Sequence, residues 1–334
     1  MNELSKNIAV QFDRVKSKVY FGLKIFVAVS LIVYLFSFID ITKFVSTFIE
    51  ADVYYLSVSM VLLIPNIFLQ YWKWKLTCEK LIGEKSRRKI FLSLFYGFPA
   101  AVFTPARAGE YFGRGLAFTN HHFSEIVIAT AVEKIFSLLI VFVIGSIGMI
   151  YFITEYYPIS FYVPLPLMVT IFVLTIIILV FIFTDKEWFF KLISPLLRIK
   201  IFAQLSNSLS MVKNLDSNFV FKMIVISLLF FFCYILQFIA LLAAFSHHAE
   251  YGDFFIASVV IMFAKTILSP LTLSDLGVRE GASVFFLSHI GESSFTALNA
   301  SLALFAVNIL LPALAGLILL FIKNDNGNSS SNIS

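Results

Sequence analysis

Residues 104–114 read TPARAGEYFGR, a charged and glycine-containing stretch inside one of the most apolar parts of the chain. The stretch interrupts the apolar region 91–118 at Thr104-Pro105, because proline ends one helix and is tolerated in the first turn of the next. The apolar arms on either side are about 11–15 residues long, or about 16–22 Å as helix, and a membrane core is about 30 Å thick. The region therefore predicts a broken helical hairpin that dips into a membrane, beside protein or a cavity that tolerates irregular backbone.

The same arrangement recurs near the end of the chain. The region 254–290 breaks at Ser269-Pro270, and its tip, residues 269–282, reads SPLTLSDLGVREGA. Its arms are also too short to span a membrane by themselves. The sequence thus predicts two broken, re-entrant helical hairpins.

The rest of the chain is typical of an all-α polytopic membrane protein. Of 334 residues, 60% are hydrophobic and only 13% are charged, and the mean hydropathy is +0.92, whereas soluble domains are about half apolar and about a quarter charged. The apolar runs are continuous, which excludes the alternating strands of a membrane barrel. Six runs are long enough to be spanning helices: 20–39, 53–72, 127–150, 162–184, 220–245 and 296–321.

Lysine and arginine predict which side each connection faces. The N-terminal segment through Lys24 holds five of these residues, 73–89 holds seven and 185–222 holds six. The connections 40–52, 151–161 and 246–253 hold one, none and none. If each hairpin returns to the side it came from, every rich segment is cytoplasmic, as the positive-inside rule requires. We therefore expect a multi-pass protein of the cytoplasmic membrane with both termini in the cytoplasm.

This topology predicts an inverted repeat in a single membrane domain, 1–334. The first repeat is 20–150 with the hairpin 91–118, and the second is 162–321 with the hairpin 254–290. Many secondary transporters share this plan, and their substrate site lies where the two broken elements meet near the midplane. The polar segment 324–334, NDNGNSSSNIS, predicts a disordered tail.

Most charges outside the loops lie in the two hairpins, where an ionisable group is costly unless it is paired or faces water. In the first tip, Thr104 is a good N-cap for a helix that opens at Pro105, and Arg107 falls in its first turn. Such a helix start binds phosphate or carboxylate. The alternative is structural: Arg107 pairs with Glu110 or Glu133 and holds the hairpin together.

The second tip repeats this pattern. Ser274 or Asp275 is placed to cap a helix that opens near Gly277, with Arg279 and Glu280 on its first turn. The alternative is again a capped helix with a local ion pair.

Three further charged residues lie outside the two tips. Residues at i and i+1 of a helix do not face each other, so Glu133 is expected to turn inward to an arginine while Lys134 extends to the cytoplasmic surface. Lys265 is equally suited to act as a counter-ion to Asp275 or Glu280, or to contact substrate.

These considerations predict a substrate site and no catalytic or metal centre. No nucleophile with a base, nucleotide fingerprint, zinc spacing or cofactor motif occurs in the sequence. The predicted substrate-binding residues are Thr104, Arg107, Glu110, Arg114, Glu133, Ser274, Asp275, Arg279 and Glu280.

The two tips resemble paired signatures of the lysylphosphatidylglycerol synthase transmembrane-region family, or flippase-like membrane proteins. The first signature, approximately T-P-G-R-x-G-E and then Arg, corresponds to Thr104–Glu110 and Arg114, with Ala106 in place of glycine. The second, approximately G-G-x-G-x-R-E-G, corresponds to Ser274–Gly281, with Asp275 in place of glycine. Glu133-Lys134 corresponds to a Glu-Arg pair of the family.

The resemblance implies a lipid flippase that moves an anionic or lipid-linked head group, with a membrane phospholipid or a lipid-linked molecule as its partner. Arg107 and Arg279 then bind the head group, and the acyl chains stay in lipid through a side opening. The chain holds no soluble aminoacyl transfer domain, so no synthase activity is expected. Three alternatives remain: an ion-coupled transporter of a small soluble anion, a membrane enzyme acting on a lipid phosphate, and an assembly partner that does not transport.

Overall fold

A computed structural model describes most of the chain after residue 48. The chain divides into two units, Met1–Glu50 and Ala51–Ser334, and all helices named below belong to the second. The described residues of this unit form helices and turns, with no strand among them, as the all-α class predicts. The described residues are 46, 49–102, 104, 107–157, 165–166, 169–170, 172–173, 211–212, 215–246, 250–268 and 277–330, with side chains to 322.

Among the described residues, five stretches of helix are long and apolar enough to cross a membrane. They are α3 (Val53–Thr77) with the π-helical turn η1 (Cys78–Ile82), α6 (Phe123–Tyr156), α10 (Ser217–Phe245), α11 (Tyr251–Leu268), and α13 (Ser294–Phe305) continued by η4 (Ala306–Leu310) and α14 (Leu311–Ser330). Four of them contain the predicted spans 53–72, 127–150, 220–245 and 296–321. The predicted span 20–39 lies outside the described residues, and 162–184 lies largely outside them. The helix α14 continues into the segment 324–334 that the sequence predicts to be disordered.

The helix α11 corrects one prediction. The sequence predicts this arm of the second hairpin to be too short to cross a membrane, but the helix has 18 residues and qualifies as a candidate span. It begins at Tyr251, three residues before the apolar run, and Lys265 is buried within its last turn instead of ending it. A lysine can stay in a membrane helix when it faces the protein interior.

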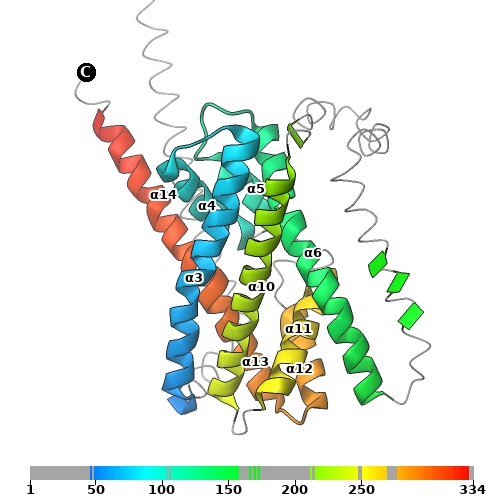
Figure 1. Cartoon of the computed structure of the whole chain (residues 1–334). Coiled ribbons are helices and arrows are strands. Elements are labelled where there is room, and N and C mark those ends of the chain that lie inside the picture. Colours follow the sequence, from blue (N-terminus) through cyan, green and yellow to red (C-terminus); the bar gives the residue numbers. More distant parts are fainter. Residues whose placement is uncertain are drawn as a thin grey trace, which may run out of the picture. The chain divides into compact units, whose positions relative to one another are not determined.

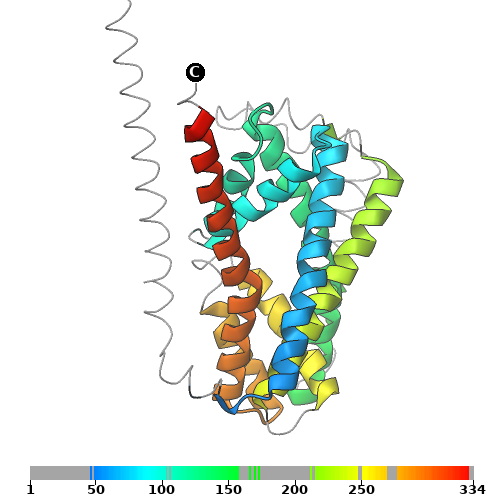
Figure 2. The ribbon, with the colours of Figure 1, turned by 90° about the vertical axis from the view of Figure 1, so that its left-hand side faces the viewer.

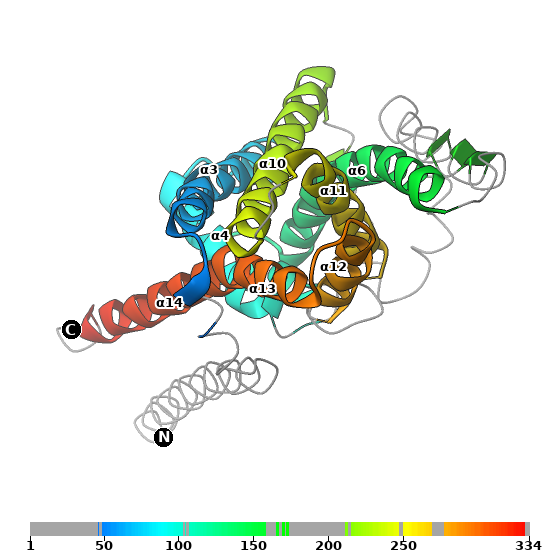
Figure 3. The ribbon, with the colours of Figure 1, turned by 90° about the horizontal axis from the view of Figure 1, so that it is seen from below.

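Both predicted hairpins form pairs of packed helices. The first consists of α4 (Arg87–Val102) and α5 (Gly109–Gly115), and the second of α11 and α12 (Val278–His289). In Figures 1 and 2, α4 and α5 lie toward the end of the unit where α3 finishes, whereas α11 and α12 lie toward the end where α3 begins. Seen from below, α11 is next to α6, α10 and α12, and it contacts all three (Figure 3).

Glycines bring the two helices of the first hairpin into backbone contact. A Cβ atom added to Gly109 or Gly113 on α5 would lie 1.9 or 2.2 Å from a carbonyl oxygen of α4. On the other side, Gly97 of α4 leaves room for the side chains of Glu110 and Arg114, whose Cγ atoms would lie 3.0 Å from its Cβ. The hairpin can therefore hold two large charged side chains within a closely packed helix pair.

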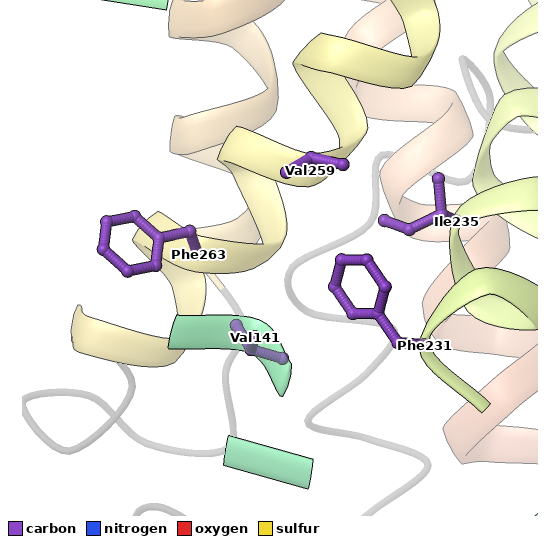
Figure 4. Close-up of a cluster of buried hydrophobic side chains, with 5 residues drawn as sticks. All are labelled: Val141, Phe231, Ile235, Val259 and Phe263. Carbon is purple, nitrogen blue, oxygen red and sulfur yellow. The ribbon is translucent and has the colours of Figure 1, made fainter. Parts of the chain in front are cut away.

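A cluster of five apolar side chains joins α6, α10 and α11 in the interior (Figure 4). Gly145 and Gly148 of α6 allow α11 to approach this cluster, because a Cβ at either position would lie 2.6 or 2.7 Å from an α11 side chain. Small residues allow such close approach between membrane helices. The cluster consists of Val141, Phe231, Ile235, Val259 and Phe263.

The contact between Gly148 and Val259 can be tested with a double-mutant cycle. We expect Gly148→Ala to destabilise the protein by about 1–3 kcal/mol, because its Cβ would lie 2.7 Å from Cγ1 of Val259. Val259→Ala removes that methyl group, so the double variant should cost less than the sum of the single changes. Unfolding in detergent measures all four proteins, and additive costs would contradict the contact.

Neutral amides connect α3, α10 and η4 inside the unit. Asn308 Nδ2 donates a hydrogen bond to Gln237 Oε1 at 2.9 Å, and Gln237 Nε2 donates to the carbonyl oxygen of Ser59 at 3.0 Å. Gln70 Nε2 donates to Asn66 Oδ1 at 2.8 Å. These bonds satisfy polar groups that hydrocarbon cannot satisfy. Gln70 also lines the cavity described next.

Candidate functional site

A cavity of about 460 Å³ lies between α3, α5, α6, α10 and α11. Part of its wall is charged: Lys73, Arg107, Glu110, Arg114, Glu133, Lys134 and Lys265. Another part is apolar and includes Ile135, Leu138, Val141, Phe230, Phe231 and Met262. A concave, mainly apolar site with a few convergent charged groups is typical of a ligand-binding pocket.

Arg114 is at the centre of the charged wall. Its guanidinium donates one hydrogen bond to Glu110 and another to Glu133 Oε2, the latter at 2.9 Å. It also lies over the ring of Trp74, 4.2 Å from the centroid, which is a favourable position for a cation. Arg114 is only 2% exposed, so these contacts replace the water that it loses.

Each carboxylate shares its charge with a further cation. Lys73 Nζ lies 2.9 Å from Glu133 Oε1, and Lys134 Nζ lies 2.9 Å from Glu110 Oε2. Arg107 Nη2 is 3.6 Å from Glu110 Oε2, which is the longest of these pairs. The result is a continuous series of opposite charges, which is how buried ionic groups are retained in a membrane protein.

The cavity wall has more positive than negative charge. Among the described residues, five cationic side chains and two carboxylates line it, so their formal balance is five minus two, or +3. Two cations, Arg107 and Lys134, are the accessible ones, with 27% and 24% of the side chain exposed. The Nε atom of Arg107 is itself buried, and it has no hydrogen-bond partner among the described residues. The cavity therefore suits an anionic ligand.

The turn before α5 differs from the sequence prediction. The predicted helix opens at Pro105 with Arg107 in its first turn, but α5 begins at Gly109 and has seven residues. Arg107 has a φ of 58°, a left-handed conformation that ends regular helix. The N-cap of α5 is Ala108 and not Thr104 as predicted, although Thr104 Oγ1 accepts a hydrogen bond from the Gly109 N–H at 2.6 Å. The positive charge therefore comes from side chains and not from a helix start at Pro105.

The described charged residues of the second tip, Arg279 and Glu280, lie apart from this cavity. Arg279 donates from Nη2 to Glu280 Oε1 at 2.6 Å and from Nε to Ser301 Oγ at 2.9 Å. Glu280 also accepts a hydrogen bond from the Gly277 N–H at 2.7 Å, which fastens the start of α12. Neither Arg279 nor Glu280 lines the cavity, whereas Lys265 of the same hairpin does. The predicted site residues Ser274 and Asp275 lie outside the described residues.

Of the charged cavity residues, Lys73 and Lys134 are not predicted to belong to the site, and substrate contact is one of two predicted alternatives for Lys265. Lys73 comes directly after the predicted span 53–72 and was counted with the loop charges, but α3 continues to Thr77 and Lys73 is only 2% exposed. Lys134 was expected to extend to the membrane surface, and its ion pair with Glu110 shows that this was wrong. Glu133 does face an arginine, as expected, and that arginine is Arg114.

Comparison with known protein families assigns the chain to one of them. A family model described as the lysylphosphatidylglycerol synthase TM region matches residues 21–316. The chain belongs to this family. It is a multi-pass membrane protein with several apolar helices, in a family linked to lipid synthesis and lipid movement. The search of curated proteins found no match.

Proposed function

We propose that this protein is a lipid flippase and that its cavity holds the anionic head group of a membrane lipid. The observation that supports the proposal is the cavity itself, whose described lining combines a charge excess of +3 with an apolar part. A small soluble anion would need only the charged wall. A lipid needs both parts, because its head group is ionic and its acyl chains are apolar.

Arg107 and Lys134 are the groups that contact the head group in this proposal. Both are accessible from the cavity, and the 3.6 Å pair between Arg107 and Glu110 is the easiest to exchange for a phosphate oxygen. Arginine binds phosphate with two parallel hydrogen bonds, so the exchange gains geometry as well as charge. Lys73 and Arg114 are buried and hold the two carboxylates in place.

The acyl chains are proposed to stay beside α6. Leu138 lines the cavity and is 43% exposed, so the apolar wall continues to the outer surface of that helix. A head group can then enter the protein while its chains remain in hydrocarbon, and only the ionic part requires a protein pathway.

The inverted repeat of the sequence analysis belongs to this proposal. The two hairpins lie toward opposite ends of the unit (Figure 1), as two repeats of opposite orientation require. The basic segment 75–89, which leaves out the buried Lys73, supports a cytoplasmic position for the α4–α5 end. The protein is then a single membrane domain with its site between two broken elements.

Lipid flipping in proteoliposomes tests the proposed function. Fluorescent phosphatidylglycerol is placed in both leaflets, and dithionite then destroys the label of the outer leaflet. We expect the signal to fall well below half with the wild-type protein. If the protein does not flip this lipid passively, the signal should stop at about half, as in empty vesicles. That outcome would reject the proposal for phosphatidylglycerol.

Arg107→Gln should slow phosphatidylglycerol flipping by at least about tenfold, because a charge-assisted bond to the head group is lost. The matched control is Arg87→Gln, which removes the same charge at the exposed start of α4. Equal rates for the two variants would show that Arg107 does not contact the head group.

A further inference from the structure

A narrower space adjoins the cavity along the same face of α11. This void lies between α10, α11, α12 and α13 and has no room for a water-sized sphere. Tyr234, Met262 and Lys265 line both the cavity and this void, so these three side chains form the partition between them. The other residues that line the void are Phe238, Ser258, Ile261, Arg279 and Leu304.

The void contains an arginine with an unused donor. Arg279 is 1% exposed, and its Nη1 has no hydrogen-bond partner among the residues that the structure describes. Its other two nitrogens are fixed by Glu280 and Ser301. A buried guanidinium that is held by Glu280 and Ser301, with the Tyr234 hydroxyl beside it, is suited to receive a further acceptor at Nη1.

The stripe of α11 that faces the void ends at Lys265. Ser258, Ile261, Met262 and Lys265 follow the i, i+3, i+4, i+7 spacing of one helix face. The neighbouring face, with Val259 and Phe263, belongs to the apolar cluster against α6 (Figure 4). Among the described residues of α11, Lys265 is therefore the cation that lines both the cavity and the void.

We infer that the void is a second subsite for the head group and that Lys265 transfers the head group to it from the cavity. This inference rests on the proposed flippase function. An anion that crosses a low-dielectric interior needs a cation at each stage. Arg107 and Lys134 supply the first stage, Lys265 the partition, and Arg279 the second subsite.

The present conformation holds the first stage open and the second closed. The void is too narrow for a water-sized sphere, so the head group enters it only when α12 or α10 moves away from α11. Met262 in the partition is a flexible side chain that can move aside. One open and one closed stage is the arrangement that alternating access requires.

The test compares binding with flipping in Lys265→Gln, with Lys265→Arg and Lys222→Gln beside it. Lys222 lies on the exposed face of α10, so its change removes the same charge away from both spaces. Binding is measured with dihexanoyl phosphatidylglycerol in detergent, and flipping with fluorescent phosphatidylglycerol in proteoliposomes. We expect Lys265→Gln to keep binding within about threefold and to lose flipping by at least about tenfold. Lys265→Arg should restore flipping, and Lys222→Gln should match the wild type.

A second variant tests the void without changing any charge. Ser258 is fully buried, and Ser258→Leu places a larger apolar side chain where the void must widen to admit the head group, so binding should be kept and flipping lost. Wild-type flipping in Lys265→Gln or in Ser258→Leu would overturn the inference and leave the proposed function intact. Equal losses of binding and flipping in Lys265→Gln would also overturn it, because Lys265 would then belong to the first stage. A wild-type protein that flips no anionic lipid would overturn both.

Discussion

Glu133→Gln is expected to destabilise the protein by about 3–5 kcal/mol, because it removes a carboxylate from between two buried cations. Lys73 and Arg114 each approach Glu133 to 2.9 Å, and each is only 2% exposed. Arg114 keeps Glu110 as a partner, whereas Lys73 keeps only a hydrogen bond to Ser137 among its described polar contacts. The buried ammonium of Lys73 is thus the main source of the loss.

Unfolding of the purified protein in detergent measures this effect. The control is Glu79→Gln, which breaks an exposed 3.6 Å pair with Lys75 and should cost less than about 1 kcal/mol. Adding Lys73→Met to Glu133→Gln should recover most of the lost stability, because the uncompensated charge is removed. Equal stability of Glu133→Gln and Glu79→Gln would contradict the buried position of the pair.

Lys73 also shows where prediction from this sequence stops. The apolar run 53–72 is sufficient to predict a span, because a membrane helix must be apolar over about 20 residues. The end of that run does not mark the end of the helix, since α3 and η1 continue to Ile82. A lysine in the extra turns is exposed or buried according to its neighbours, and the neighbours that bury Lys73 come from α6 and α10. Such contacts between distant segments leave no local pattern.

Lys134 shows a second limit. Consecutive helix residues point about 100° apart, so the sequence favours opposite environments for Glu133 and Lys134. The cavity is wide enough that both line it, and the length of the lysine side chain lets it reach Glu110 on α5. The turn at Arg107 is similar, because its left-handed backbone is determined by the packing of α5 on α4 and not by the residue itself. The sequence was sufficient to locate the charged residues of the first hairpin, but not to predict which of them form ion pairs.

The two hairpins have similar motifs but differ in how closely their glycines pack against other residues. Gly113 of the first tip and Gly281 of the second are equally compatible with close packing from the sequence alone. In the structure a Cβ on Gly113 would lie 2.2 Å from the carbonyl oxygen of Tyr96, whereas a Cβ on Gly281 would have no atom of the described residues within 4 Å apart from its own stretch of helix. The same residue type therefore has a packing role in α5 that it lacks in α12.

Gly113→Ala is accordingly expected to destabilise the protein by about 3 kcal/mol or more. The obstacle is backbone, so α5 must retreat by about 1 Å to reach ordinary contact distance. Arg114 is the next residue and Glu110 lies one turn earlier, so the movement also separates the ion pairs of the cavity wall. Unfolding in detergent and binding of dihexanoyl phosphatidylglycerol should both report the change.

Gly281→Ala is the matched control, and it should be neutral or stabilising by up to about 1 kcal/mol, the difference in helix propensity. It makes the same chemical change in a helix of the other hairpin, so any general effect of replacing a helical glycine is present in both variants. The difference between the two variants therefore isolates the contact between α4 and α5. If Gly113→Ala were as stable as Gly281→Ala and bound lipid equally well, the close approach that positions Glu110 and Arg114 would be wrong, and the charged wall of the cavity would need another support.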